Sequence, residues 1–217
     1  MLKLLTAKQT KEADNFTIIN EPIRSSELME RAAKALSKVL MEKFPNRKNK
    51  ILIFCGKGNN GGDGLAIARL LLEEGYHDIK TYIADFATNS SEDFEYNLER
   101  LQLKDGLIYY IKNIEDIDYE DADLVIDALL GSGLNKPLSG DWEKLIRKIN
   151  NLSGYKISVD IPTGMPCEGE LFNNVIIKSG CVSDLLIHVS HRSPPSNFIR
   201  LTNACNPNDN FDIIYHT

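Results

Sequence analysis

The sequence predicts an α/β domain in which helices cover both faces of a mostly parallel sheet, and three observations carry this prediction. From residue 50 onward, short apolar runs of strand length alternate with amphipathic runs of helix length. A helix between two successive strands is the usual connection of a parallel pair. The 217 residues contain no repeat, low-complexity tract or linker, and their number suits one domain. We therefore expect a single domain over residues 1–217.

Two helices are expected before the first strand. Thr6 begins a capping box that predicts a helix over about residues 7–19. Ser25 or Ser26 can cap a second helix that runs to about Phe44. The apolar residues of this second helix recur at helical spacing, so one of its faces should pack on the sheet or against a partner subunit, and a two-fold homodimer is expected.

Five strands and three further helices follow in alternation. The strands are expected at residues 51–55, 80–84, 107–111, 124–127 and 155–160. The helices are expected at residues 65–74, 92–101 and 141–149. Gly75 is placed to end the first of these helices, and Ser90 or Ser91 to begin the second. The resulting architecture is a Rossmann-like three-layer α/β/α sandwich, in which polar residues collect beyond the carboxyl ends of the strands.

Composition excludes several classes of function. The net charge of −6 argues against a nucleic-acid surface, and no apolar run approaches the ~20 residues that cross a bilayer. The first five residues are too short for a signal-peptide core, so a cytoplasmic protein is expected. The four cysteines have no C-x-x-C spacing and no histidine at ligand distance, which argues against a zinc site. They are Cys55, Cys167, Cys181 and Cys205.

The segment Gly56–Gly64 carries the most specific local signal. It lies between a strand and a helix, and Gly56, Gly58 and Gly61 match the dinucleotide spacing G-x-G-x-x-G. Such a turn brings backbone N–H groups and the positive end of a helix to a phosphate. Asp63 does not suit a plain dinucleotide site, because a carboxylate beside a diphosphate is repulsive unless it turns away, binds a cation or takes part in the chemistry.

Two further polar loops, 127–137 and 160–164, follow strands that end on the same edge of the sheet. Asp127 and Asp160 offer two carboxylates there, which suits acid/base work, a shared cation, or capping of the turn after each strand. Asn60, Asp127 and Thr163 are all hard oxygen ligands, which favour an alkali or alkaline-earth ion. Each of the three loops is expected to deliver polar groups into one crevice.

Taken in order, these segments resemble the signature loops of the NAD(P)H-hydrate epimerases, whose domain is called the YjeF N-terminal domain. The matching segments are residues 28–32, 59–64, 127 with 131–137, and 159–164. The resemblance covers about residues 1–165. Thr163 stands where the family usually has serine, and residues 171–217 are atypical because they do not align with the family's ending.

The resemblance implies an isomerase that interconverts the R and S epimers of hydrated NADH and NADPH, after which a companion dehydratase repairs the S form. It implies one potassium ion per subunit, held by Asn60, Asp127 and Thr163. Asp160 is the expected general acid/base. The residues expected to contact the dinucleotide are Asn59, Asn60, Gly61, Gly62, Asp63, Gly131, Ser132, Gly133, Leu134, Asn135, Lys136, Pro137 and Asp160. Lys57 and Lys136 are the basic residues expected nearest the phosphates.

Two other functions fit parts of the pattern. The same fold resembles the dimerising domain of messenger-RNA decapping scaffolds, which is a noncatalytic binding module, but the intact Asp127 and Asp160 argue against it. An ordinary NAD(P)-dependent oxidoreductase would use the glycines of 56–61, with Asp85 as the carboxylate that binds the ribose. That function leaves the other two loops without a role.

Overall fold

The computed structural model describes residues 7–116, 121–166, 176–177, 185–189 and 199–202, and it forms one seven-stranded sheet. The strand order is β3-β2-β1-β4-β5-β6-β7, with every neighbouring pair parallel except β6 and β7. The strands are β1 (Ile51–Cys55), β2 (Ile79–Ala84), β3 (Leu107–Ile111), β4 (Leu124–Ala128), β5 (Tyr155–Val159), β6 (Leu185–Val189) and β7 (Ile199–Thr202). The helices are α1 (Ala7–Asn20), α2 (Ser25–Lys43), α3 (Asn59–Glu73), α4 (Glu92–Gln102), the 3-10 helix η1 (Ile114–Asp116) and α5 (Asp141–Asn151).

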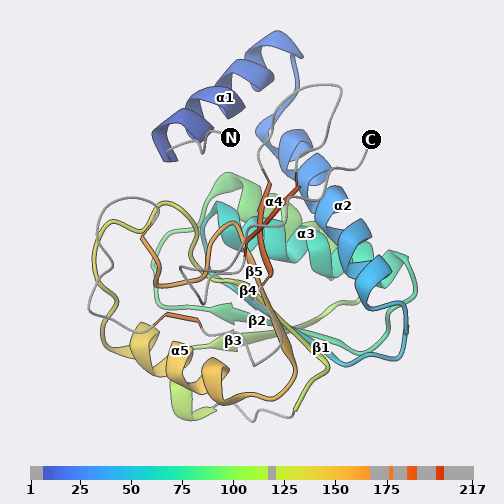
Figure 1. The fold of residues 1–217 in the computed structure, drawn as a ribbon, viewed down its shortest axis with the longest axis vertical. Coiled ribbons are helices and arrows are strands. Elements are labelled where there is room, and N and C mark those ends of the chain that lie inside the picture. Colours follow the sequence, from blue (N-terminus) through green and yellow to red (C-terminus); the bar gives the residue numbers. More distant parts are fainter. Residues whose placement is uncertain (1–6, 117–120, 167–175, 178–184, 190–198, 203–217) are drawn as a thin grey trace.

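The three-layer α/β/α architecture is confirmed (Figure 1). The helices α2, α3 and α4 cover one face of the sheet, and α5 with η1 covers the other. In β1, Ile51 and Ile53 point to the first face, whereas Leu52 and Phe54 point to the second. A strand that is buried on both faces reads as a continuous apolar run, which is why this segment shows no polar alternation.

The five predicted strands are confirmed, but two local predictions are wrong. The helix expected from Leu65 begins at Asn59, so residues 59–64 of the presumed loop belong to α3. The residue that caps α2 is Arg24 and neither serine, because the Arg24 N–H donates to the Glu27 carboxylate over 2.8 Å. The capping residue predicted for the first helix, Thr6, lies outside the described residues.

Residues 171–217, which do not align with the family's ending, contribute β6 and β7 at one edge of the sheet. The edge strand β7 runs antiparallel to β6, and the remainder of residues 171–217, apart from 176–177, lies outside the described structure. This edge therefore extends the sheet beyond β5, whose carboxyl end borders the site described below.

The apolar face of α2 packs within its own chain, against α3 and the sheet. Of the two packing partners expected for this face, the sheet side of its own chain is confirmed, and the homodimer stays a prediction. A charged cluster joins the same helices. Arg69 of α3, only 3% exposed, donates to the Glu30 carboxylate of α2 over 2.5 Å, and Arg100 of α4 donates to the same carboxylate over 2.7 Å. These contacts fix α3, whose first turn belongs to the site, relative to α2 and α4.

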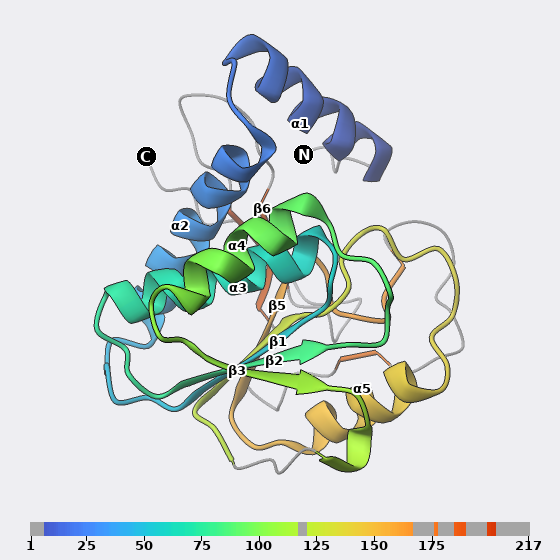
Figure 2. The ribbon, with the colours of Figure 1, turned by 180° about the vertical axis from the view of Figure 1, so that it is seen from behind.

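Helix α1 stands apart from the three layers and is joined to α2 by a short turn (Figures 1 and 2). Its Phe16 and Ile19 side chains are 67% and 75% exposed. In the part of the chain that the structure describes, no helix has both the length and the apolar character needed to cross a membrane.

Candidate functional site

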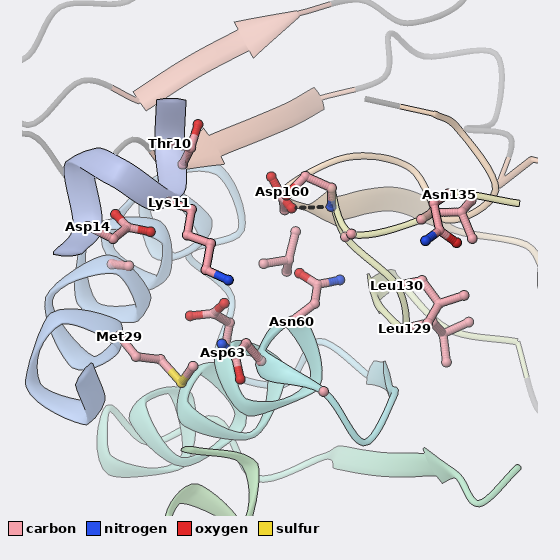
Figure 3. A pocket seen from close by; sticks show the side chains of 18 of the residues that line it. Thr10, Lys11, Asp14, Met29, Asn60, Asp63, Leu129, Leu130, Asn135 and Asp160 are labelled. Atoms are coloured by element: carbon pink, nitrogen blue, oxygen red, sulfur yellow. Dashed lines mark hydrogen bonds between the residues drawn. The ribbon is translucent and has the colours of Figure 1, made fainter. Parts of the chain in front are cut away.

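A cavity of about 1040 Å³ lies at the carboxyl ends of β4 and β5 and the start of α3. Helices α1 and α2 form one side, the first turn of α3 lies between, and the loop after β4 with Asp160 forms the other side (Figure 3). The three loops that follow the predicted strands therefore meet at one place, as expected. What each predicted residue does there differs.

The first turn of α3 faces the cavity through Asn59, Asn60 and Asp63. No side chain caps this helix, since its N-cap residue is Gly58. The unpaired N–H groups of a helix start and the helix dipole favour an anion at such a position. The sequence prediction of an anion-binding turn is thus supported by the backbone arrangement.

Gly61 and Gly62 do not line the cavity, although both were predicted to contact the dinucleotide. A Cβ on Gly61 would collide with the carbonyl of Gly56, and one on Gly62 would lie 3.0 Å from the sulfur of Met29. These two glycines are needed because the turn and the neighbouring helix approach so closely. Their place in the motif is explained by packing.

Asn60 carries the most informative polar group of the site. Both its side-chain oxygen and its side-chain nitrogen are buried, and neither has a hydrogen-bond partner among the residues that the structure describes. Leaving a buried amide without partners costs on the order of 1–3 kcal/mol for each group. A buried polar group without a partner at a cavity wall is a position that a water, an ion or a ligand can complete.

Asp127 and Thr163 lie behind the cavity wall and do not line it. The Asp127 carboxylate is 1% exposed and accepts four hydrogen bonds. Its donors are Leu129 N (3.2 Å), Ser158 Oγ (2.8 Å), Thr163 N (2.9 Å) and Thr163 Oγ1 (2.6 Å). Burial raises the pKa of Asp127, and the hydrogen bonds from Thr163, Ser158 and Leu129 oppose that rise. The expectation that Asp127 reaches into the crevice is wrong, because its oxygen atoms tie β4 to β5.

Thr163 continues this connection on its other side. Its Oγ1 donates to Asp127 and accepts from the Leu130 N–H over 3.0 Å. The Leu130 carbonyl lies 3.2 Å from the same Oγ1, whose proton already serves the shorter contact with Asp127. Two oxygen atoms with lone pairs therefore face each other at Leu130. The next residue, Gly131, lies beside Asn60, because a Cβ on Gly131 would lie 3.3 Å from the Cγ of Asn60.

Asp160 does line the cavity, and its backbone is unusual. Its φ of +66° lies in the left-handed region, which a residue other than glycine adopts at a cost of about 1–3 kcal/mol. The Ser132 N–H donates to Asp160 Oδ2 over 2.6 Å and fixes the carboxylate. A Cβ on Gly131 would collide with Asp160 Oδ2 and lie 3.3 Å from the Cγ of Asn60. Gly131 thus separates the two polar side chains, and the positive φ together with the Ser132 hydrogen bond places the Asp160 carboxylate in the cavity.

Asp63, near the start of α3, lines the same cavity as Asp160 and lies on the side of Lys11 (Figure 3). Burial first, and then the negative charges of Asp160, Asp93 and Asp14, raise the pKa of Asp63 well above its usual range. The Lys11 side chain of α1 extends toward the same space (Figure 3). Two carboxylates in different environments at one cavity are the arrangement that separates acid and base roles in enzymes.

The predicted loop from Gly131 to Pro137 lines the cavity along its whole length, so Lys136 lies at the site. Lys57 does not. Its ammonium group donates to Asp85 Oδ1 and to the Ala87 carbonyl, each over 2.8 Å, and the hydrogen bond from Lys57 lowers the pKa of Asp85. The phosphate contact expected of Lys57 is therefore not formed from this position.

Some residues that line the cavity lie outside the sequence motifs and were not predicted. Lys11 and Asp14 come from α1, and Trp142 comes from the start of α5. Only the turn between α1 and α2 and the crossover to α5 bring these residues to the loops. In the sequence, only Trp142 pointed to this part of the wall, because it is the single tryptophan of the chain and lies five residues after Pro137.

Comparison with known proteins agrees with this geometry. The family described as YjeF-related protein N-terminus matches residues 25–185. The chain is 38% identical over 168 residues to the NAD(P)H-hydrate epimerase of Anaerococcus prevotii, covering 75% of each chain. It is 36% identical over 176 residues to that of Limosilactobacillus fermentum, covering 81% of each.

The chain is also similar to part of a longer protein and to a solved structure. A bifunctional NAD(P)H-hydrate repair enzyme of Dictyoglomus turgidum is 36% identical over 182 residues, which are 81% of this chain but only 34% of that protein. The crystal structure of the yeast protein ynu0 superposes with a TM-score of 0.68 at 19% identity, covering 89% of this chain and 90% of that one. The yeast structure confirms the fold.

Proposed function

Because the chain belongs to the family of YjeF-related N-terminal domains, we propose that it is an isomerase that interconverts the R and S epimers of hydrated NADH and NADPH. One observation carries the proposal: the first turn of α3, the loop from Gly131 to Pro137 and Asp160 border a single cavity. The names of the relatives identify the reaction, and the cavity offers a place for a dinucleotide.

The chain's own groups suit this reaction. The hydroxyl of the hydrated ring is bonded to a carbon next to the ring nitrogen. Asp160 donates a proton to that hydroxyl, the C–O bond breaks, and the nitrogen lone pair forms a C=N bond as water leaves. Water then adds to either face of the cation and returns a proton to Asp160, so the acid is regenerated and the product differs only in configuration. The Ser132 N–H orients the Asp160 carboxylate throughout.

Asn60, Asp127 and Thr163 are the residues that would hold a potassium ion. The unsatisfied Asn60 oxygen and the facing oxygen atoms of Thr163 and Leu130 fit a monovalent cation with oxygen ligands. Asp127 would contribute its charge from behind the wall. Such an ion supplies positive charge next to the phosphates and ties the loops together. An ion bound by the Asn60 side-chain oxygen would remove the cost of leaving that buried oxygen without a partner.

The ion has a direct test. Replacing the sodium in the buffer with potassium should raise the melting temperature of the wild-type protein, because a ligand that binds only the folded state stabilises that state. The Asn60→Leu variant should lose this response. An equal rise in both proteins would contradict the assignment of Asn60.

The rival functions receive less support from the structure. The oxidoreductase reading needs Asp85 free for a ribose, but Lys57 holds that carboxylate. The noncatalytic scaffold reading does not explain why Asp160 keeps a strained backbone with its carboxylate in the cavity. We therefore retain the epimerase.

The companion dehydratase, the homodimer and the cytoplasmic location complete the proposal. A relative that carries both repair functions in one protein supports the partnership with a dehydratase. Sedimentation of the purified chain tests the homodimer, and a mass of one protomer at micromolar concentration would contradict it.

The enzymatic test uses one purified epimer of hydrated NADPH and follows the appearance of the other by chromatography. The wild-type chain should accelerate epimerisation, and Asp160→Asn should lower kcat/KM by roughly 10²–10⁴-fold, the usual contribution of a general acid/base. Lys57→Met, which changes a lysine outside the cavity, is the matched control and should keep its rate. A wild-type rate in Asp160→Asn, with its fold intact by circular dichroism, would refute the role of Asp160.

A further inference from the structure

The wall of the cavity that no motif predicted contains one aromatic side chain. Trp142 is half-buried in the first turn of α5, and it is the only aromatic residue among those described as lining the cavity. Its neighbours in the wall include Leu134 and Leu138, which are apolar. This end of the cavity therefore differs from the end formed by α1, where Lys11 and Asp14 bring charge.

The indole is held in position before any ligand arrives. Phe86 meets Trp142 in a T-shaped contact with the ring centroids 5.1 Å apart and the planes at 89°. Such contacts stabilise a defined ring orientation. A ring whose plane is already fixed loses little conformational entropy when a flat ligand stacks on it.

The chemistry of the ligand selects which ring can stack there. In the hydrated dinucleotide the nicotinamide ring contains saturated carbons and is neither flat nor aromatic. The adenine is then the one planar aromatic ring of the molecule. Stacking of a base on an aromatic side chain needs no particular pattern of hydrogen bonds.

We propose that Trp142 is the stacking platform for the adenine ring of the dinucleotide, so that the adenine lies against the start of α5 while the hydrated ring lies at Asp160. This inference rests on the proposed function for the identity of the ligand. Lys136, which lines the same cavity, is the basic residue of the loop from Gly131 to Pro137 that could contact the diphosphate. The alternative is that Trp142 serves only to pack α5 against Phe86.

The single tryptophan makes the first measurement direct. ADP-ribose carries the adenine and the diphosphate but no nicotinamide, and it should quench the intrinsic tryptophan fluorescence in a saturable manner. Binding seen by calorimetry with no change in tryptophan emission would overturn the proposal. This measurement uses the wild-type chain, so it does not depend on the folding of any variant.

Two variants separate stacking from packing. Trp142→Leu removes the aromatic face and should weaken ADP-ribose binding about 5- to 150-fold, the range that base stacking contributes. Trp142→Phe keeps an aromatic face and should bind more tightly than the leucine variant. In epimerisation, Trp142→Leu should raise KM and leave kcat close to wild type, because the adenine is remote from the reacting carbon. Unchanged affinity in the leucine variant, or a parallel fall in kcat, would assign Trp142 to packing alone.

Failure of the inference and failure of the proposed function give different results. A chain that epimerises hydrated NADPH but does not bind ADP-ribose at millimolar concentration overturns the stacking site and keeps the enzyme. A chain that shows the quench and its loss in Trp142→Leu but no epimerisation keeps the adenine site and overturns the proposed reaction.

Discussion

The hydroxyl of Thr163 should contribute more to stability than its methyl group, because it makes two contacts that no other group can replace. It donates to the Asp127 carboxylate over 2.6 Å and accepts from the Leu130 N–H over 3.0 Å, and Thr163 is fully buried. Thr163→Val keeps the shape of the side chain and removes both contacts. The lost hydrogen bond and the stranded N–H together cost about 2–4 kcal/mol of the free energy of unfolding. Thr163→Ser keeps the hydroxyl and removes one buried methyl group, which costs about 1 kcal/mol.

Urea denaturation at neutral pH tests this difference. With an m-value of about 2 kcal/mol/M, Thr163→Val should lower the unfolding midpoint by about 1–2 M and Thr163→Ser by about 0.5 M. The m-values of all three proteins must agree for the midpoints to report stability. If the valine variant unfolds at the same urea concentration as the serine variant, the hydroxyl does not tie β4 to β5, and the account of the wall behind the cavity is wrong.

Two further predictions follow from the same structure. Gly131→Ala should abolish dinucleotide binding, because its Cβ would collide with the carboxylate of Asp160. Calorimetry with ADP-ribose compares this variant with the wild-type protein. Arg69→Met should cost about 3 kcal/mol at pH 7, because it leaves the Glu30 carboxylate partly buried with fewer partners. Burial raises the pKa of Glu30, but hydrogen bonds from Arg100 and Arg69 outweigh it and lower the pKa. The stabilisation by ionised Glu30 is therefore present above its unfolded pKa of about 4.3 and is lost as pH falls through the lower folded value. The difference in urea unfolding midpoint between wild type and Arg69→Met should shrink between pH 5 and about pH 3. A difference in midpoint that stays constant with pH would contradict the ion-pair explanation.

The fold was largely predictable because its signals are local. Each of the five predicted strands is a short apolar run, and the helices between them carry their own start and stop residues, such as Ser91 and Gly75. The start of α3 was not predictable, because Asn59 and Gly61 have weak helix propensity. The helix begins at Asn59 because Gly61 packs closely on Gly56 and Gly62 packs closely on Met29. The strands β6 and β7 were not predicted, because they lie in the segment that does not align with the family's ending, and no local motif specifies that β6 pairs with β5 and β7 with β6.

The residues of the site also include some that the sequence predicts and some that it does not. The loop from Gly131 to Pro137, and Asn59, Asn60 and Asp63, were predicted at the cavity and lie there, since each belongs to a contiguous motif. Lys136 and Lys57 looked equivalent, and only the long-range contact with Asp85 distinguishes them. Long-range packing of this kind leaves no pattern in a single sequence.

The two aspartates show how a small backbone difference assigns opposite roles. Both follow apolar residues of neighbouring parallel strands at the same sheet edge, so the sequence treats them alike. Asp127 lies inside β4, in register with Phe54 and Ser158, and alternation turns its side chain toward the face covered by α5, where protein donors surround it. Asp160 lies one residue beyond β5, and its positive φ turns the chain so that the carboxylate meets the cavity instead. The strain at Asp160 is thus the cost of removing one carboxylate from the sheet, and it follows that a glycine at this position should relieve strain and stabilise the fold while removing the acid that the chemistry needs.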